Sequence, residues 1–325
     1  MRLIAVSRVL NEDDIIEAFV RHHAPLVDHH LMLDNGSTDR TIEILRTLKQ
    51  EGMRITVLQN RSPMFAEIRY NTMLFQLAAT RFAANWVLFL DCDEFLDERR
   101  VSGGLRSRLA EMQADDVCLH LPMVWYHPTA NDDAAEPIVP VRVRRREPKF
   151  ADIFKLCIRG ELAAHGVEID RGNHSAFWRD QQIAARVADD LVLAHYYRRS
   201  AWQVVTKAVV GWLKVLAAGQ EAVEARANFH YAATIETLRD NPAALLLDPD
   251  FVAYSPFETD VVDDPIGYAG GALRYTLLAD PMMKAIAVIT AYAESLARQH
   301  GRLIDGNAAV RMVADNLAAQ WTEVV

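Results

Sequence analysis

The sequence predicts an α/β fold in which a mostly parallel, Rossmann-like sheet is flanked by helices and followed by a helical C-terminal tail. Short apolar or β-branched runs alternate with helical patterns over the first ninety residues, which is typical of a parallel sheet. The continuous apolar run Trp86–Leu90 suits a strand buried on both faces. From Ala201 onward the patterns are mainly helical.

The first half of the chain predicts four strands separated by helices. Gly36 supplies a turn after the second strand, and Ser37 or Thr38 can cap the helix that follows. A long amphipathic helix is expected from about Ala66 to Ala84. The expected strands are Leu3–Val9, His29–Leu33, Ile55–Leu58 and Trp86–Leu90.

Beyond residue 100 the pattern is less regular. Further strands are expected at Val117–Tyr126, Val141–Arg146 and around Ile153–Arg159, with a polar loop at Thr129–Pro140. The last well-marked helix has Asp280 as its cap, Pro281 at its first position and Gly301 just past its end. We expect an α/β domain over residues 1–240 and a mostly helical extension over residues 241–325.

The composition limits the kinds of molecule that this protein is expected to bind. The 325 residues hold 35 Lys and Arg against 44 Asp and Glu, a net charge of -9, which argues against nucleic-acid binding because that needs a concentrated basic surface. Three widely spaced cysteines indicate neither a disulfide framework nor a zinc site. No signal peptide or transmembrane segment is recognisable, and we expect a cytoplasmic protein.

The acidic segment Asp91-Cys92-Asp93-Glu94 follows the buried fourth strand. If the backbone stays extended, Asp91 and Asp93 point to the same face, at the edge where open α/β sheets bind ligands. Paired carboxylates suit Mg²⁺ or Mn²⁺ shared with substrate phosphates. The alternative is an acidic turn that only contacts solvent.

A second segment, Asp34-Asn35-Gly36-Ser37-Thr38-Asp39, follows the second strand. Capping and turn formation explain it on their own. The functional interpretation is that an amide or a carboxylate here contacts a nucleobase.

Together these motifs resemble the family-2-like glycosyltransferases with the GT-A fold. The matching residues are Asn11-Glu12, the Asp34–Asp39 turn, Arg69 with Asn71, and Leu90-Asp-Cys-Asp-Glu-Phe-Leu. The resemblance implies donor contacts by Asn11, Asp34, Asn35, Arg69 and Asp91, with Asp91 on the ribose, and a divalent metal at Asp91 and Asp93. That family usually has a second acid where this chain has Asn35, so the base preference stays open.

A later stretch, His195-Tyr-Tyr-Arg-Arg199-Ser with Lys207 beyond it, is similar to a segment of the same branch. His195 could complete the metal shell, and Arg199 and Lys207 could neutralise a diphosphate leaving group. The alternative is a core histidine followed by a solvated helix start. Lys207 and Lys214 share one face of the apolar segment Trp202–Leu216, which favours a packed helix over contact with a membrane surface.

The expected reaction moves a sugar from a nucleoside-diphosphate sugar to a hydroxyl of a glycan or another acceptor. The resemblance implies inversion, which requires a base for the acceptor proton. The candidates lie among Glu161, His165, Glu168 and Asp170. We favour Asp170, followed by His165.

Two other functions remain open. An apolar strand followed by Asp-x-Asp also describes phosphohydrolases of the haloacid dehalogenase type, although those carry it on their first strand, with Thr or Val where this chain has Phe95. A degenerate transferase could also persist as a binding subunit for nucleotide sugars or glycans, although the intact Asp91 and Asp93 argue against it.

Overall fold

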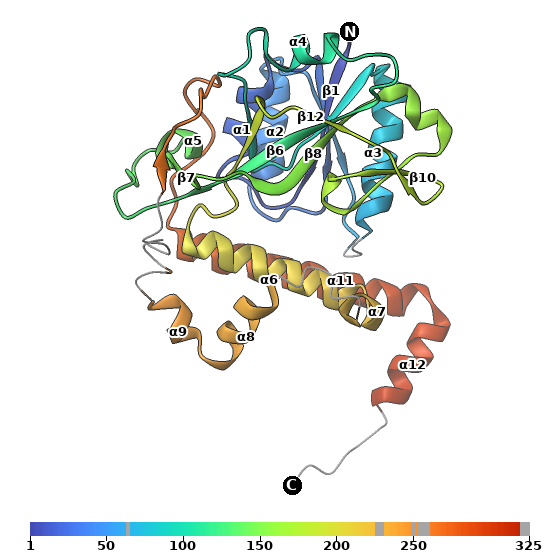
Figure 1. Ribbon diagram of the computed structural model, residues 1–325. Helices are drawn as coiled ribbons and strands as arrows, with labels where there is room; N and C mark the ends of the chain where they lie inside the picture. Colours follow the sequence, from blue (N-terminus) through green and yellow to red (C-terminus); the bar gives the residue numbers. More distant parts are fainter. Residues whose placement is uncertain (63–65, 225–230, 249–250, 252–260, 319–325) are drawn as a thin grey trace.

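The computed structural model describes residues 1–62, 66–224, 231–248, 251 and 261–318. A central sheet with helices on both faces makes up the α/β part, and long helices lie across one end of it (Figure 1). Shorter helices extend away from that end. The predicted fold class, a mostly parallel sheet flanked by helices and followed by a helical region, is confirmed.

The four predicted strands of the first half are present and parallel. They are arranged in the order β3-β2-β1-β4. Val9 pairs with Asp34 and Asp34 pairs with Gln59, so the carboxyl ends of β1, β2 and β3 meet at one edge. Their bounds are β1 (Leu3–Val9), β2 (His29–Asp34), β3 (Ile55–Gln59) and β4 (Trp86–Phe89).

The sheet continues beyond β4 with antiparallel pairs. β8 (Ala151–Arg159) lies between β4 and β6 (Cys118–His127) and is antiparallel to both. β13 (Val192–His195) joins β6 in parallel and β5 (Glu94–Asp97) in antiparallel orientation. His195 therefore lies opposite Glu94, the last residue of the acidic segment.

The remaining strands are short. β12 (Arg186–Val187) and β7 (Arg145–Arg146) pair with β6, and β14 (Val262–Asp263) pairs with β7. A separate three-stranded sheet contains β9 (Glu168–Ile169), β10 (Ala176–Trp178) and β11 (Gln181–Gln182).

Alternation along β1 divides the core into two layers. Leu3 and Ala5 pack in one cluster with Phe19, whereas Ile4 and Val6 pack in the other with Leu74, as the two-residue period of a strand requires. α1 and α2 therefore cover one face and α3 the other. The helices of this part are α1 (Ile16–His23), α2 (Thr41–Gln50), α3 (Glu67–Phe82), α4 (Gly104–Ala110), α5 (Val139–Arg142), and the 3₁₀ helices η1 (Gly160–His165) and η2 (Arg171–Asn173).

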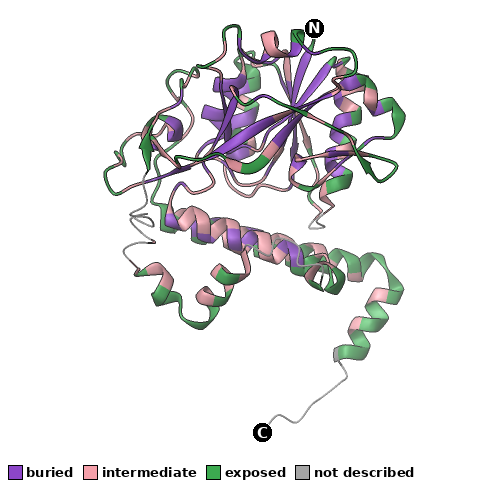
Figure 2. Ribbon diagram, in the orientation of Figure 1, coloured by how far each residue is buried: buried purple, intermediate pink, exposed green. Residues whose placement is uncertain are grey.

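Two long helices, α6 (Ala201–Ala217) and α11 (Pro281–Gly306), pack side by side across the end of the α/β part. Buried residues occur along α6 and in the first half of α11, whose last turns are half-buried or exposed (Figure 2). The shorter helices are α7 (Gln220–Glu224), α8 (Ala232–Asp240), α9 (Pro242–Leu246) and α12 (Ala308–Ala318). None of the described helices is both long enough and apolar enough to cross a membrane.

Two predicted boundaries were wrong. Val141–Arg146 is not one strand, because Val139–Arg142 forms a helical turn that leaves only Arg145–Arg146 paired. α11 begins as predicted, with the Asp280 carboxylate accepting from the amide of Met283, but it continues past Gly301 to Gly306. A glycine inside a helix costs only about 1 kcal/mol, which a helix of this length tolerates.

Candidate functional site

The acidic segment after β4 is a turn and not an extended strand. The amide of Glu94 donates to the carbonyl of Asp91 at 3.0 Å, and the Glu94 carboxylate accepts from the Asp91 amide at 2.8 Å. The turn breaks the alternation of side chains, so the prediction that Asp91 and Asp93 share a face was wrong. Asp91 instead contacts Lys155, and Asp93 contacts Lys207.

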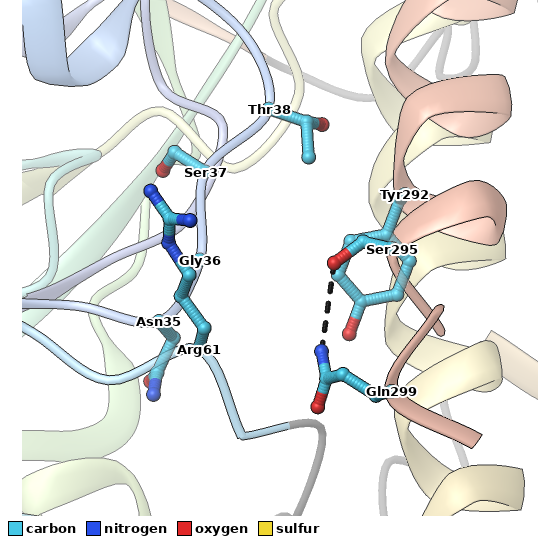
Figure 3. A pocket seen from close by; sticks show the side chains of 8 residues that line it. All are labelled: Asn35, Gly36, Ser37, Thr38, Arg61, Tyr292, Ser295 and Gln299. Carbon is cyan, nitrogen blue, oxygen red and sulfur yellow. Dashed lines mark hydrogen bonds between the residues drawn. The ribbon is translucent and has the colours of Figure 1, made fainter. Parts of the chain in front are cut away.

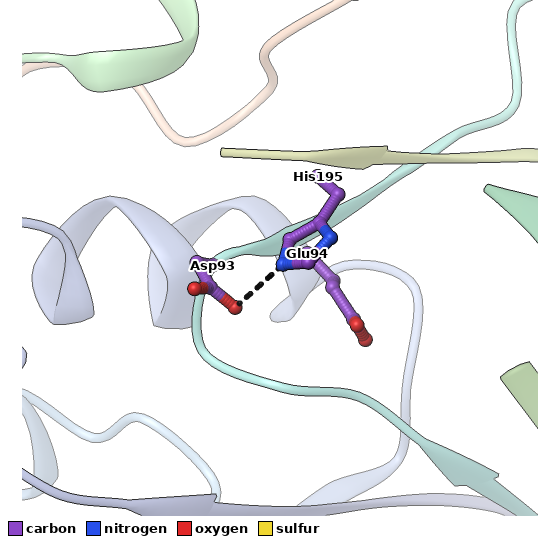
Figure 4. A group of neighbouring side chains, drawn as sticks. All are labelled: Asp93, Glu94 and His195. Carbon is purple, nitrogen blue, oxygen red and sulfur yellow. Dashed lines mark ion pairs between the residues drawn. The ribbon is translucent and has the colours of Figure 1, made fainter. Parts of the chain in front are cut away.

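Asp93, Glu94 and His195 form a cluster in which one ligand atom from each residue lies within 4.8 Å of the other two (Figure 4). His195 Nε2 lies 3.5 Å from Asp93 Oδ1. The structure thus brings Asp93 and His195 together and adds Glu94, which the sequence analysis did not include. The register of β13 with β5 produces this cluster, and no pattern in the sequence reveals that register.

The two carboxylates of this cluster differ in pKa. Burial opposes ionisation of Asp93, but Lys207, His195 and Arg199 outweigh it and hold the Asp93 pKa well below its usual range. Burial raises the pKa of Glu94 to about 7, against the opposing charge of Lys155. Two carboxylates and an imidazole are a donor set that Mn²⁺ and Mg²⁺ accept, and a metal would displace the Glu94 proton.

The segment 195–207 supplies cations beside Asp93. Lys207 Nζ lies 2.7 Å from Asp93 Oδ2 and 3.8 Å from Glu12 Oε1. Arg199 is buried, and its guanidinium donates to Glu12 at 2.5 Å and to Asp14 at 2.7 Å. Lys207 is half-buried and Arg199 is already held by two carboxylates, so of these two residues Lys207 has the more accessible charge.

Lys155, in the middle of β8, is a site residue that the sequence analysis missed. Its ammonium is buried and lies 2.5 Å from Asp91 Oδ2, 3.1 Å from Glu94 Oε1 and 2.7 Å from the carbonyl of Gly172. Burial opposes ionisation of Asp91, but Lys155 and Arg8 outweigh it and lower the Asp91 pKa. A lone lysine in an apolar strand was the available signal, because a buried charge requires a partner.

The two predicted base candidates lie in different surroundings. Asp170 caps η2, its carboxylate accepting from the Arg171 amide at 2.7 Å, two residues before the Gly172 carbonyl that contacts Lys155. His165 is exposed at the end of η1. Asp170 is thus connected to Asp91 through η2, whose Gly172 carbonyl contacts the same lysine as Asp91.

The turn after β2 is held by Asp34. This buried carboxylate accepts from the amides of Gly36 and Ser37, each at 3.1 Å, and from Gln59 Nε2 at 2.8 Å. Gly36 has a φ of +94°, the conformation predicted for it. Helix α2 is capped differently from the prediction, because Asp39 rather than Ser37 or Thr38 accepts from the Thr41 amide.

Asn11 joins the loop after β1 to this turn. Its Oδ1 accepts from the Thr38 amide at 2.7 Å. The Nδ2 groups of both Asn11 and Asn35 are buried and have no hydrogen-bond partner among the described residues. Buried amide donors seldom stay unpaired without a ligand or water. Arg69, by contrast, is exposed on α3.

A cavity of about 190 Å³ lies between this turn and helix α11. Figure 3 shows the turn and Arg61 on one side and three α11 side chains on the other. The C-terminal region therefore contributes to the same edge of the sheet as the predicted motifs. The lining residues are Asn35, Gly36, Ser37, Thr38, Arg61, Tyr292, Ser295 and Gln299.

Residues 9–146 match the family model of glycosyl transferase family 2. This range contains Asn11, the Asp34–Asp39 turn and the Asp91–Glu94 turn, and the match confirms the resemblance predicted from those motifs. A comparison with curated proteins found no match.

Solved structures with detectable similarity are distant. A mannosyltransferase from Pyrobaculum calidifontis in complex with GDP-Man and Mn²⁺ is 14% identical, with a TM-score of 0.40, over 92% of this chain and 86% of that one. Glucosyl-3-phosphoglycerate synthase from Mycobacterium tuberculosis with Mg²⁺ and UDP is 20% identical, with a TM-score of 0.28, over 38% of this chain and 43% of that one. The match spans 43% of the synthase's length in this complex and 59% in its complex with phosphoglyceric acid.

Proposed function

Because residues 9–146 match glycosyl transferase family 2, we propose that this protein transfers a sugar from a nucleoside-diphosphate sugar to a hydroxyl acceptor. Inversion at the anomeric carbon and use of Mn²⁺ or Mg²⁺ are parts of the proposal. The observation that carries it is that three distant segments lie at the same edge of the sheet, namely the Asp34–Asp39 turn, the Asp91–Glu94 turn and His195–Lys207.

Asp93, Glu94 and His195 would hold the divalent cation. Asp91, predicted as a metal ligand, is not part of this cluster, because its carboxylate is paired with Lys155. When bound, the metal would neutralise charge on the donor phosphates. Asp93 is prepared for this role because its neighbours keep it ionised. His195 would add one imidazole to the two carboxylates, which are the kind of ligand that Mn²⁺ and Mg²⁺ both prefer.

Lys207 would stabilise the leaving diphosphate. Negative charge grows on the phosphates as the bond to the sugar breaks, so a fixed ammonium beside them favours the transition state over the ground state. Asp93 and Glu12 raise the Lys207 pKa despite its burial, so Lys207 stays charged. Arg199 would position Glu12, Asp14 and Asp93 around it.

The cavity beside Asn35 would take the nucleobase. Its volume of about 190 Å³ is below the roughly 300–1,000 Å³ of sites for whole drug-sized ligands, which suits one part of the donor. The Nδ2 group of Asn35, which has no hydrogen-bond partner in the described part of the chain, suits a carbonyl oxygen on a base edge. Tyr292, Ser295 and Gln299 of α11 would form the opposite wall, which gives the C-terminal region a part in donor choice.

The general base for the acceptor hydroxyl is assigned to Asp170, with His165 as the second candidate. Asp170 is supported by its connection through η2 to Lys155 and Asp91. The acceptor is proposed to be a glycan or another hydroxyl compound, and the place of action the cytoplasm.

A thermal-shift panel of nucleoside diphosphates with and without Mn²⁺ tests the proposal. We expect at least one diphosphate to raise the melting temperature in a metal-dependent way, and incubation with the matching sugar donor to release that diphosphate. Phosphate release from an aryl phosphate, abolished by Asp91→Asn, would instead indicate a phosphohydrolase. Metal-dependent binding without hydrolysis or transfer of any donor would indicate a binding subunit.

A further inference from the structure

Asn71 belongs to a motif that the proposed chemistry does not use. It forms part of the family resemblance together with Arg69, but it lies on the buried side of α3 and is only 1% exposed. Its Nδ2 group donates to the carbonyl oxygen of Asp170 at 2.9 Å, across 99 positions of the chain. Asn71 therefore contacts the backbone of the residue to which the general base is assigned.

Two other side chains of α3 hold the same stretch of backbone. Thr72 Oγ1 accepts from the amide of Ile169 at 3.0 Å. Glu67 Oε1 accepts from the amide of Gly172 at 2.9 Å. Because the first of these amides precedes Asp170 in the chain and the second follows it, α3 holds the backbone on both sides of the base candidate.

Residues 170–173, called the Asp170 turn from here on, need such support. Gly172 and Asn173 both have positive φ, +67° and +58°. The amide of Asn173 closes the turn by donating to the carbonyl of Asp170 at 3.2 Å. A residue other than glycine keeps a left-handed conformation only where the surrounding structure holds it, and α3 supplies that structure here.

The Asp170 carboxylate depends on the backbone for its place. Among the residues that the structure describes, this carboxylate accepts a single hydrogen bond, at Oδ1 from the amide of the adjacent Arg171 at 2.7 Å. No contact from another element fixes the carboxylate within that part of the chain. A shift of the turn therefore moves the carboxylate with it.

Lys155 connects the Asp170 turn to the metal cluster. Its Nζ donates to the carbonyl of Gly172 at 2.7 Å and lies 3.1 Å from Glu94 Oε1. The turn is thus held by α3 on one side and by a lysine that contacts the cluster on the other. A general base must lie within hydrogen-bond reach of the hydroxyl that it deprotonates, so the spacing between the turn and the cluster bears on the reaction.

We propose that Asn71 is a positioning residue that sets the place of the Asp170 carboxylate relative to the metal cluster. The inference rests on the proposed function, in which Asp170 is the base. In that reaction the acceptor oxygen bonds to the anomeric carbon of the sugar, and the acceptor proton passes to the Asp170 carboxylate. The bond between the anomeric carbon and the phosphate oxygen breaks, and the diphosphate leaves with its electron pair.

Steady-state release of diphosphate from UDP-glucose and from GDP-mannose, with Mn²⁺ present and water as the acceptor, tests this inference. Asn71→Leu removes the amide donor at nearly constant volume. It should lower kcat about 10- to 100-fold, the cost of a misplacement of about 1 Å, and leave the KM of the donor and the Kd of its diphosphate within about twofold. Gln76→Leu removes an exposed amide from the same helix, is the matched control and should change none of these values.

A double-mutant cycle with Asp170→Asn separates positioning from a general effect on the fold. Asp170→Asn should lower kcat at least about 100-fold, as expected for the loss of a general base. Because Asn71 acts through Asp170, adding Asn71→Leu to Asp170→Asn should lower kcat by no more than about a further twofold. A purely structural role would lower kcat equally in both backgrounds.

Thr72→Val decides the question if Asn71→Leu does not fold. It keeps the shape of the side chain and removes the acceptor of the Ile169 amide. It should lower kcat about three- to tenfold, the range expected for one lost hydrogen bond, and should have no further effect in the Asp170→Asn background.

The outcomes separate the two proposals. If wild type releases a diphosphate and a folded Asn71→Leu keeps the wild-type kcat, the inference is refuted while the proposed function stands. Equal losses of kcat in the two backgrounds, or a weaker Kd in place of a lower kcat, would likewise refute it. Full activity of Asp170→Asn would refute the base assignment and this inference together. Absence of release by wild type would refute the transfer function itself, and this inference with it.

Discussion

Lys207 Nζ contacts Asp93 Oδ2 at 2.7 Å, although 114 residues separate them in the chain. The other oxygen of the same carboxylate, Oδ1, lies on the side of His195. Asp93 therefore presents one oxygen to the metal cluster and the other to the α6 lysine. In the proposed function, this one carboxylate would contact both the divalent cation and the lysine that neutralise a diphosphate leaving group.

Lys155→Met should destabilise the protein by about 3 kcal/mol, because it leaves the Asp91 and Glu94 carboxylates without their buried cation. Urea unfolding measures the change. Lys149→Met, at an exposed position, is the control and should stay within about 0.5 kcal/mol of wild type. Equal stability of Lys155→Met and wild type would contradict the role given to Lys155.

Gln299→Ala should weaken binding of the preferred nucleoside diphosphate about three- to tenfold, the range expected for one lost hydrogen bond. It should also reduce the preference between UDP and GDP, because Gln299 lines the cavity assigned to the base. His300→Ala changes the next, exposed residue of α11 and should leave both values unchanged. Titration calorimetry in the presence of Mn²⁺ measures both values. If Gln299→Ala changes neither the affinity nor the preference, α11 does not take part in donor recognition.

His30 should make the fold more sensitive to acid. Burial lowers its pKa to about 3, whereas the unfolded chain titrates near pH 6.5. Between these values the unfolded state binds more protons, so stability falls as the pH falls from about 6.5. Urea unfolding at pH 7, 6 and 5 should show wild type losing about 1 kcal/mol per unit more than His30→Gln. Both proteins contain Asp39, whose pKa shift changes stability with pH in the opposite direction, so its contribution cancels when the two slopes are compared. Identical slopes would show that His30 is not buried as a neutral base.

Local patterns predicted the parallel half of the sheet because each of its strands carries its own signal. The runs at Leu3–Val9 and Trp86–Leu90 match β1 and β4 to within one residue. The motifs also pointed to Asp93, His195 and Lys207, and the structure brings these three side chains together.

Other parts of the site depend on contacts between distant segments. The turn at Asp91–Glu94 forms through hydrogen bonds that Glu94 makes back to Asp91, which an extended pattern does not predict. Lys155 reaches Asp91 only because β8 inserts between β4 and β6. The cavity at Asn35 is closed by α11, more than 250 residues later, and pairing across such distances leaves no periodic signal in the chain.

The most direct test of the donor site compares wild type and Asp93→Ala by thermal shift, with the preferred nucleoside diphosphate and Mn²⁺. Wild type should gain stability only when both ligands are present, by about 2.7 kcal/mol at a ligand concentration 100 times the Kd. Asp93→Ala should fold and show no metal-dependent gain. An equal gain in Asp93→Ala, or no gain in wild type with any diphosphate, would contradict the assignment of this edge of the sheet as a nucleotide-sugar site.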